Sequence, residues 1–112
     1  MQIIKGLTPD EWRIAIACVR AIVEGPWFSP DDPGADQELE TVLSFTRAEL
    51  REIYKQLCAD VKPDNRMLRA IGQCLNSVCG FPAPKGSAGR WVATNESELE
   101  ALCDKWFREV DP

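Results

Sequence analysis

The chain has 112 residues, of which 45% are hydrophobic and 28% are charged, and its formal net charge is −5. These values are typical of a single globular domain, over residues 1–112, that buries one core without disulfides or structural metal ions. No apolar run reaches the ~18 residues that span a bilayer, and the first residues do not read as a signal peptide, so we expect a cytoplasmic protein with no membrane partner.

Charge is distributed unevenly along the chain. Residues 1–46 contain three basic and eight acidic side chains, residues 47–90 contain eight and four, and residues 91–112 contain two and six. The overall acidity disfavours nucleic-acid binding, because phosphate contacts need clustered Lys and Arg. The basic middle segment keeps nucleic acid open as an alternative.

Three segments predict the starts of helices. Thr8–Glu11, Thr46–Glu49 and Asn95–Glu98 each place a capping residue three positions before a Glu. In such a capping box the cap oxygen accepts a backbone N–H of the first turn, and the Glu accepts the N–H of the cap residue. An apolar run at helical spacing follows each box, which predicts a mostly α-helical fold.

The first predicted helix, Pro9–Glu24, has the widest apolar face, and Gly25 with Pro26 ends it. A helix this apolar is expected to be surrounded on most sides, so we predict a compact bundle of about five helices around it. Its thin polar stripe consists of Arg13, Ala17, Arg20 and Glu24.

Four further helices are expected over residues 36–44, 47–60, 65–79 and 96–110, with Asp64 capping the third of them. Gly72 is expected to mark a close approach of another helix. Residues 81–94 read as a surface loop in which Trp91, Val92 and Ala93 could add a short strand beside Ile3 and Ile4, giving a minor two-stranded patch. The predicted buried positions of the four helices are Leu39, Val42, Leu43, Leu50, Ile53, Tyr54, Leu57, Cys58, Val61, Met67, Leu68, Ile71, Cys74, Leu75, Val78, Leu99, Leu102, Cys103, Trp106, Phe107 and Val110.

The cysteine pattern favours core packing over chemistry. Five cysteines are an odd number, and they are spread evenly, which is a poor disulfide framework. Cys18, Cys58, Cys74 and Cys103 fall on or beside predicted apolar stripes, where a free thiol acts as a small hydrophobe.

No catalytic, cofactor or metal site is predicted, and we expect a protein that is not an enzyme. The chain contains no histidine, so Ser–His and Cys–His pairs cannot form. Residues 31–36 do not match a calcium loop, and Cys74 with Cys79 has neither the spacing nor the second pair of a zinc site. The acids of residues 31–40 are expected to form a solvated acidic face.

Protein binding, or self-association, is the preferred function. Exposed Trp and Arg dominate interface hot spots, although the loop aromatics could instead cover the ends of the bundle. An acidic inhibitor or immunity-type protein that neutralises a basic target is one concrete form of this hypothesis. The candidate partner-binding residues are Trp27, Phe28, Asp31, Asp32, Asp36, Glu38, Arg90 and Trp91.

The alternative is a nucleic-acid-associated helical module that uses the basic, solvent-facing side of residues 47–69. Acidic residues interleave with the basic ones, and a recognition helix usually follows a tight turn. The candidate basic face consists of Arg47, Arg51, Lys55, Arg66 and Arg69.

Several fragments resemble a group of small bacterial helical proteins. The group carries a GP-aromatic…WEFxTLxG run, then NNxLNNLLGYP and a closing E-E-[LV]…W. The matching fragments are Glu24–Trp27, Glu38–Leu43, Thr46–Leu50, Ala70–Pro82 and Leu99 with Trp106. Gly72 and Gln73 stand where the group has paired asparagines, and Ala83 stands where it has His. The resemblance implies a shared helical fold and no activity, and it singles out Asn76 as either an exposed polar residue or a buried amide.

Overall fold

The computed structural model of the chain describes residues 6–80 and 83–110. A 3-10 turn, η1 (Pro26–Phe28), follows the first helix, and a π-helical turn, η2 (Trp106–Val110), extends the last one. The mostly α-helical fold predicted from the sequence is confirmed. The helices in the described ranges are α1 (Pro9–Glu24), α2 (Ala35–Leu43), α3 (Arg47–Cys58), α4 (Asn65–Gly80), α5 (Ser87–Val92) and α6 (Glu96–Lys105).

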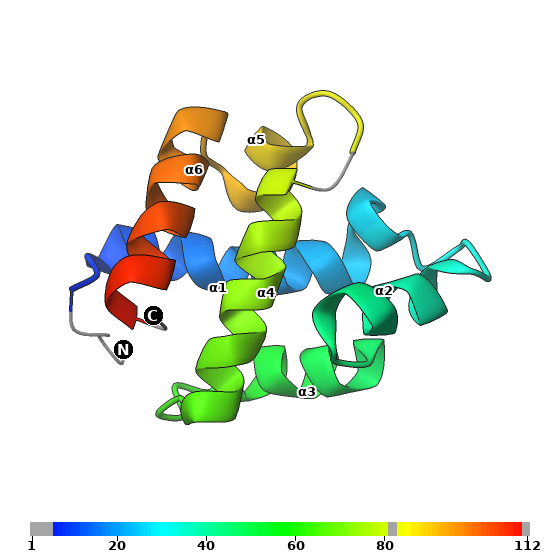
Figure 1. Ribbon diagram of the computed structural model, residues 1–112, viewed down its shortest axis with the longest axis horizontal. Coiled ribbons are helices and arrows are strands. Elements are labelled where there is room, and N and C mark those ends of the chain that lie inside the picture. Colours follow the sequence, from blue (N-terminus) through cyan, green and yellow to red (C-terminus); the bar gives the residue numbers. More distant parts are fainter. Residues whose placement is uncertain (1–5, 81–82, 111–112) are drawn as a thin grey trace.

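Helix α1 is the central element, as its wide apolar face predicted. It contacts α3, α4, α5 and η1, and α4 crosses in front of it near the centre of Figure 1. Helices α2 and α3 lie on one side of this crossing, and α5 and α6 lie on the other. Its buried side chains are Trp12, Ile14, Ala15, Cys18, Val19, Ala21, Ile22 and Val23.

Two of the three predicted capping boxes are complete. The Thr8 hydroxyl accepts the Glu11 N–H at 3.1 Å, and the Glu11 carboxylate accepts the Thr8 N–H at 2.9 Å. Thr46 and Glu49 make the same two bonds at the start of α3. Each box satisfies backbone donors that the first turn of a helix leaves without a partner.

The third start is only half of a capping box. The Asn95 side chain accepts the Glu98 N–H at 2.8 Å, as expected. The Glu98 carboxylate accepts the Thr94 hydroxyl at 2.7 Å, rather than the N–H of the cap residue. The hydroxyl of Thr94, one residue before the cap, therefore replaces the backbone N–H of Asn95 as the donor to Glu98.

Gly72 allows the close helix approach that the sequence predicted. Trp106, at the start of η2, is fully buried and stacks on Trp12 with ring centroids 6.4 Å apart. A Cβ added at Gly72 would lie 2.8 Å from Trp106 Nε1, a nitrogen with no hydrogen-bond partner in the described part of the chain. Only glycine lets the indole lie this close to α4.

The strand expected at Trp91, Val92 and Ala93 is wrong, and so is the description of residues 81–94 as a loop. This segment contains α5, which begins after Gly86 at φ 86° and ends at Ala93 at φ 56°. Val92 is fully buried against α1, so tertiary packing overrides the strand preference of a Trp-Val pair. The proposed partner strand, Ile3 and Ile4, lies outside the described residues.

Four predicted core positions face solvent. Val42 and Val61 are each 44% exposed, Phe107 is 40% exposed, and Cys58 is also exposed. The apolar stripes are wider than the surfaces that cover them. α3 ends at Cys58 rather than at residue 60, so Val61 lies beyond the helix. The π-helical turn η2 replaces the last α-helical turn predicted for residues 96–110, so the side chains of this turn, including Phe107, no longer follow α-helical spacing.

Candidate functional site

Three of the residues predicted to bind a partner lie around one groove. The groove between η1 and α5 has a volume of about 400 Å³. Arg90 and Asp31 are exposed at its edge, and the Trp91 indole is half-buried. We refer to it as the η1–α5 groove, and its lining residues are Glu24, Gly25, Pro26, Ser29, Pro30, Asp31, Pro84, Lys85, Ser87, Arg90 and Trp91.

A buried arginine supports the η1 side of this groove. Arg47 Nη2 donates to the Phe28 carbonyl at 2.6 Å, and Nη1 donates to the carbonyls of Val23 and, at 3.4 Å, Ile22. The last carbonyls of a helix have no partner within it, and a cation there is favourable. Because α1 has no basic residue in its own last turn, Arg47 from the start of α3 fills that role.

Arg47 therefore does not belong to a solvent-facing basic surface, which corrects that prediction. Its side chain is only 7% exposed, and Nε donates to the Asp36 carboxylate at 2.6 Å. This ion pair ties α3 to the first turn of α2 and engages an acid that was predicted to bind a partner. The Arg47 guanidinium can be buried because its N–H groups donate to three backbone carbonyls and one carboxylate.

Two arginines of α1 hold the α5 side of the groove. Arg13 Nη1 donates to the Val92 carbonyl at 3.2 Å, at the end of α5. The Arg20 guanidinium carbon lies 5.3 Å from the centroid of the Trp91 ring, within the range of a cation–π contact. Glu24 fixes Arg20 in turn through a bond of 3.2 Å. The predicted polar stripe of α1 thus positions the exposed face of α5.

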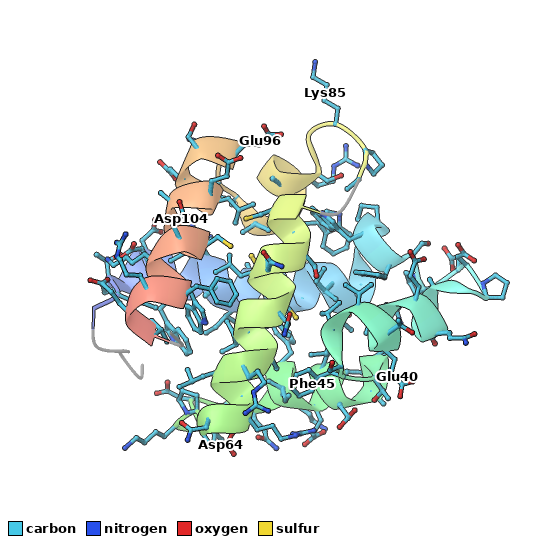
Figure 2. All side chains as sticks on the ribbon, viewed as in Figure 1. Glu40, Phe45, Asp64, Lys85, Glu96 and Asp104 are labelled. Carbon is cyan, nitrogen blue, oxygen red and sulfur yellow. The ribbon has the colours of Figure 1, made fainter. Side chains whose placement is uncertain are left out.

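Trp27 and Phe28 belong to the core. They are 5% and 2% exposed, so these aromatics cover the end of the bundle, as one of the two readings of the sequence expected. Trp91 is the aromatic side chain that η1 and α5 leave accessible at the groove. Pro84 and Lys85 also line the groove, and Lys85 extends away from the rest of the molecule in Figure 2.

Of the acidic face predicted for residues 31–40, only Asp31 lines the groove. Asp31, Asp32, Glu38 and Glu40 are exposed. The Asp32 carboxylate accepts the Gly34 N–H at 3.0 Å, which shapes the turn before α2 and leaves its charge at the surface. With Asp36 held by Arg47, the other acids remain available to an incoming surface.

The predicted basic face is smaller than the sequence suggested. Arg66 donates to the Glu49 carboxylate at 2.7 Å and lies 5.5 Å from the Phe45 ring centroid. Residues 59–64 separate α3 from α4, so the two helices are not joined by a tight turn. The remaining members of the face, all exposed, are Arg51, Lys55 and Arg69.

A second groove, the α4–α6 groove, has a volume of about 490 Å³. Its walls include Val78 and Cys79 from α4, Leu99 from α6, and the segment 83–89. The Cys79 thiol is half-buried, and burial raises its pKa to about 12. Asn76, the residue singled out by the family resemblance, is exposed on the same helix, so it is not a buried amide.

The described ranges hold no group of three or more side chains able to bind a metal ion. Among these same residues, no helix is both long and apolar enough to cross a membrane. Comparison of the chain with protein-family models, curated proteins and solved structures finds no match. The geometry of the chain itself therefore carries the functional argument.

Sequence reasoning missed Arg47 as the support of the groove. One weak signal was available: α1 ends at Gly25-Pro26 without a basic residue in its last turn, where a cation from another segment is favourable. The sequence also gave no reason to pair Cys79 with Cys103, which come from different helices and face each other across the α4–α6 packing.

Proposed function

We propose that the chain is a non-enzymatic protein-binding domain that holds a partner at the η1–α5 groove. Trp91 and Arg90 act as the anchors, since Trp and Arg contribute most to the binding energy of protein interfaces. The observation that carries the proposal is the fixation of both groove walls by internal bonds, from Arg47 on one side and from Arg13 and Arg20 on the other.

Fixed walls favour binding because a partner then loses little free energy to ordering the site. An immobilised long side chain costs about 0.5–1.5 kcal/mol on association. The Trp91 indole is already held by Arg20 before a partner arrives. Its exposed surface is therefore presented in one orientation, which is the arrangement expected of an anchor.

The surrounding charge favours a basic partner. In the groove lining, Glu24 and Asp31 are balanced by Lys85 and Arg90, so the preference comes from the exposed acids of the neighbouring segment, Asp32, Glu38 and Glu40. Complementary charge accelerates encounter and selects among partners. An acidic inhibitor or immunity-type protein acting on a basic target fits this arrangement. We also propose a cytoplasmic location, which the odd number of cysteines supports.

The test is affinity capture from host lysate with the tagged chain and matched variants. Trp91→Ala and Arg90→Ala should each reduce recovery of a stoichiometric protein partner at least tenfold. Arg69→Glu, an exposed change outside the groove, should leave recovery unchanged. Circular dichroism checks that each variant is folded.

Equal recovery with folded Trp91→Ala would refute the groove as the binding surface. Light scattering on the purified chain tests self-association, because a dimer that dissociates in Arg90→Ala makes the partner a second copy. If no protein is recovered and the chain is monomeric, the binding-domain proposal fails under those conditions.

The alternative function, a nucleic-acid-associated helical module, has less support. Its candidate face loses Arg47 to the interior and Arg66 to an ion pair with Glu49. Phosphate contact depends on clustered, unpaired cations. Charge reversal of Arg51 and Lys55 separates the two functions, because it should abolish salt-sensitive nucleic-acid binding and leave protein capture intact.

A further inference from the structure

Two half-buried thiols from different helices lie against each other. Cys79 Sγ donates to the Leu99 carbonyl at 3.6 Å, and Leu99 lies one turn before Cys103 on α6. Cys103 Sγ lies 3.9 Å from the Asn76 side-chain oxygen, and Asn76 lies about one turn before Cys79 on α4. Residues three or four apart share a helix face. These crossed contacts therefore place the thiols opposite each other.

Each thiol also perturbs the pKa of the other, as expected for side chains this close. Figure 2 shows sulfur atoms in the space between α4 and α6. The remaining thiols differ in access: Cys18 and Cys74 are buried, and Cys58 is exposed on α3. Cys103 is only half-buried, so a small reagent can reach its sulfur directly, and Cys79 lines the adjoining α4–α6 groove.

We propose that Cys79 and Cys103 form a thiol–disulfide exchange site, at which an oxidised low-molecular-weight thiol of the glutathione class closes a disulfide between α4 and α6. Neither thiol lines the η1–α5 groove, so the proposal does not rest on the binding function proposed for that groove.

The exchange proceeds in two substitutions. Cys103 loses its proton to solvent and attacks one sulfur of the external disulfide, and the first external thiolate leaves. Cys79 then loses its proton and attacks the Cys103 sulfur, and the second external thiolate leaves. Two thiols and one external disulfide become one protein disulfide and two external thiols, each of which takes up one proton.

The environment assigns the attacking role to Cys103. Burial raises the pKa of both thiols, whereas the neighbouring Cys79 side chain partly offsets this rise in the pKa of Cys103. The thiolate is the nucleophile, so the thiol whose pKa is raised less has the larger thiolate fraction and reacts first. Raised pKa values also make the exchange slow, and we expect it over hours at mildly alkaline pH.

The test incubates the native chain with oxidised glutathione at mildly alkaline pH, followed by alkylation and intact-mass analysis. We expect two thiols to become resistant to alkylation without carrying glutathione, and peptide mapping to find a disulfide between Cys79 and Cys103. The exposed Cys58 should carry one glutathione. The adduct on Cys58 shows that the reagent is active.

Single-thiol variants supply the matched controls. Cys103→Ser should leave Cys79 unlinked and slow to react, whereas Cys79→Ser should trap glutathione on Cys103. Cys58→Ser should form the disulfide as the native chain does. The proposal is overturned if Cys79 and Cys103 remain alkylatable once Cys58 has reacted, or if the mapped link joins another pair.

Denaturant unfolding of the oxidised chain provides a readout that needs no variant. The bond would close a loop over residues 79–103, which lowers the unfolding equilibrium constant roughly 100- to 500-fold in the chain-entropy treatment. A lower stability in the oxidised chain would mean that the native thiols are not placed for bonding, and would also overturn the proposal.

Discussion

Replacing Arg47 by Met tests the claim that one buried cation holds three elements together. The change keeps an unbranched apolar stem and removes every donor. The carbonyls of Val23 and Phe28 then lose the bonds from Arg47 at the end of α1 and in η1. Asp36 loses its ion pair as well, but its side chain is 68% exposed and returns to water.

The expected loss follows from these partners. A hydrogen bond to a charged donor is worth about 1.5–3 kcal/mol, so the two bonds to Val23 and Phe28 together contribute about 3–6 kcal/mol. The contact with Ile22, at 3.4 Å, is long and adds little. The exposed end of the ion pair contributes below about 1 kcal/mol. We therefore expect a decrease of about 4 kcal/mol in the free energy of unfolding, a large part of the ~5–15 kcal/mol of a small domain.

Urea unfolding followed by fluorescence of the four tryptophans measures this difference. Arg51→Met on the same helix, where the side chain is exposed, is the matched control and should change the free energy by less than about 0.5 kcal/mol. A loss for Arg47→Met no larger than that of the control would refute the reasoning. Equal losses for Arg47→Met and Asp36→Asn would show that the ion pair, rather than the carbonyls, provides the stability.

Two further predictions concern packing and pH. Gly72→Ala should lower the free energy of unfolding by about 1–3 kcal/mol, because the new methyl group overlaps the indole of Trp106. Gly80→Ala, where a Cβ would have nothing within 4 Å, should be neutral or slightly stabilising. Thermal unfolding of the two variants measures this difference, and equal melting temperatures would contradict the prediction. The pKa of Glu49 is held below its usual value of 4.5 by the backbone N–H of its cap residue and then by Arg66, so this carboxylate stabilises the fold above that value and the contribution disappears as the pH falls through its lowered pKa. Stability measured from pH 7 to pH 3 should fall less steeply in Glu49→Gln than in the native chain, and parallel curves would refute the assignment.

The elements that the sequence predicted well depend on local signals. The start of α1 and the start of α3 follow from capping boxes, and Asp64 caps α4 through a bond of 2.8 Å to the Met67 N–H. The close approach at Gly72 was also predictable, because glycine inside a helix is costly unless something requires it. These features need only a few neighbouring residues to be read correctly.

The features that were missed depend on distant contacts. Nothing local marks α5, which is six residues long and contains Gly89, so only its burial against α1 makes it a helix. Arg47 lies at a position that its charge and the helical period assign to solvent, and its partners are 11 to 25 residues away. The groove could not be predicted either, because Asp31 and Trp91 come from segments joined only by the tertiary fold.

The segment around Pro84, Lys85 and Ser87 forms a wall of both the η1–α5 groove and the α4–α6 groove. A ligand that displaces this wall on one side alters the shape of the site on the other side. Two ligands bound in this way would affect each other's affinity by the same factor, because such an effect between sites is reciprocal. The shared wall gives this small domain the structural requirement for allosteric communication between two surfaces.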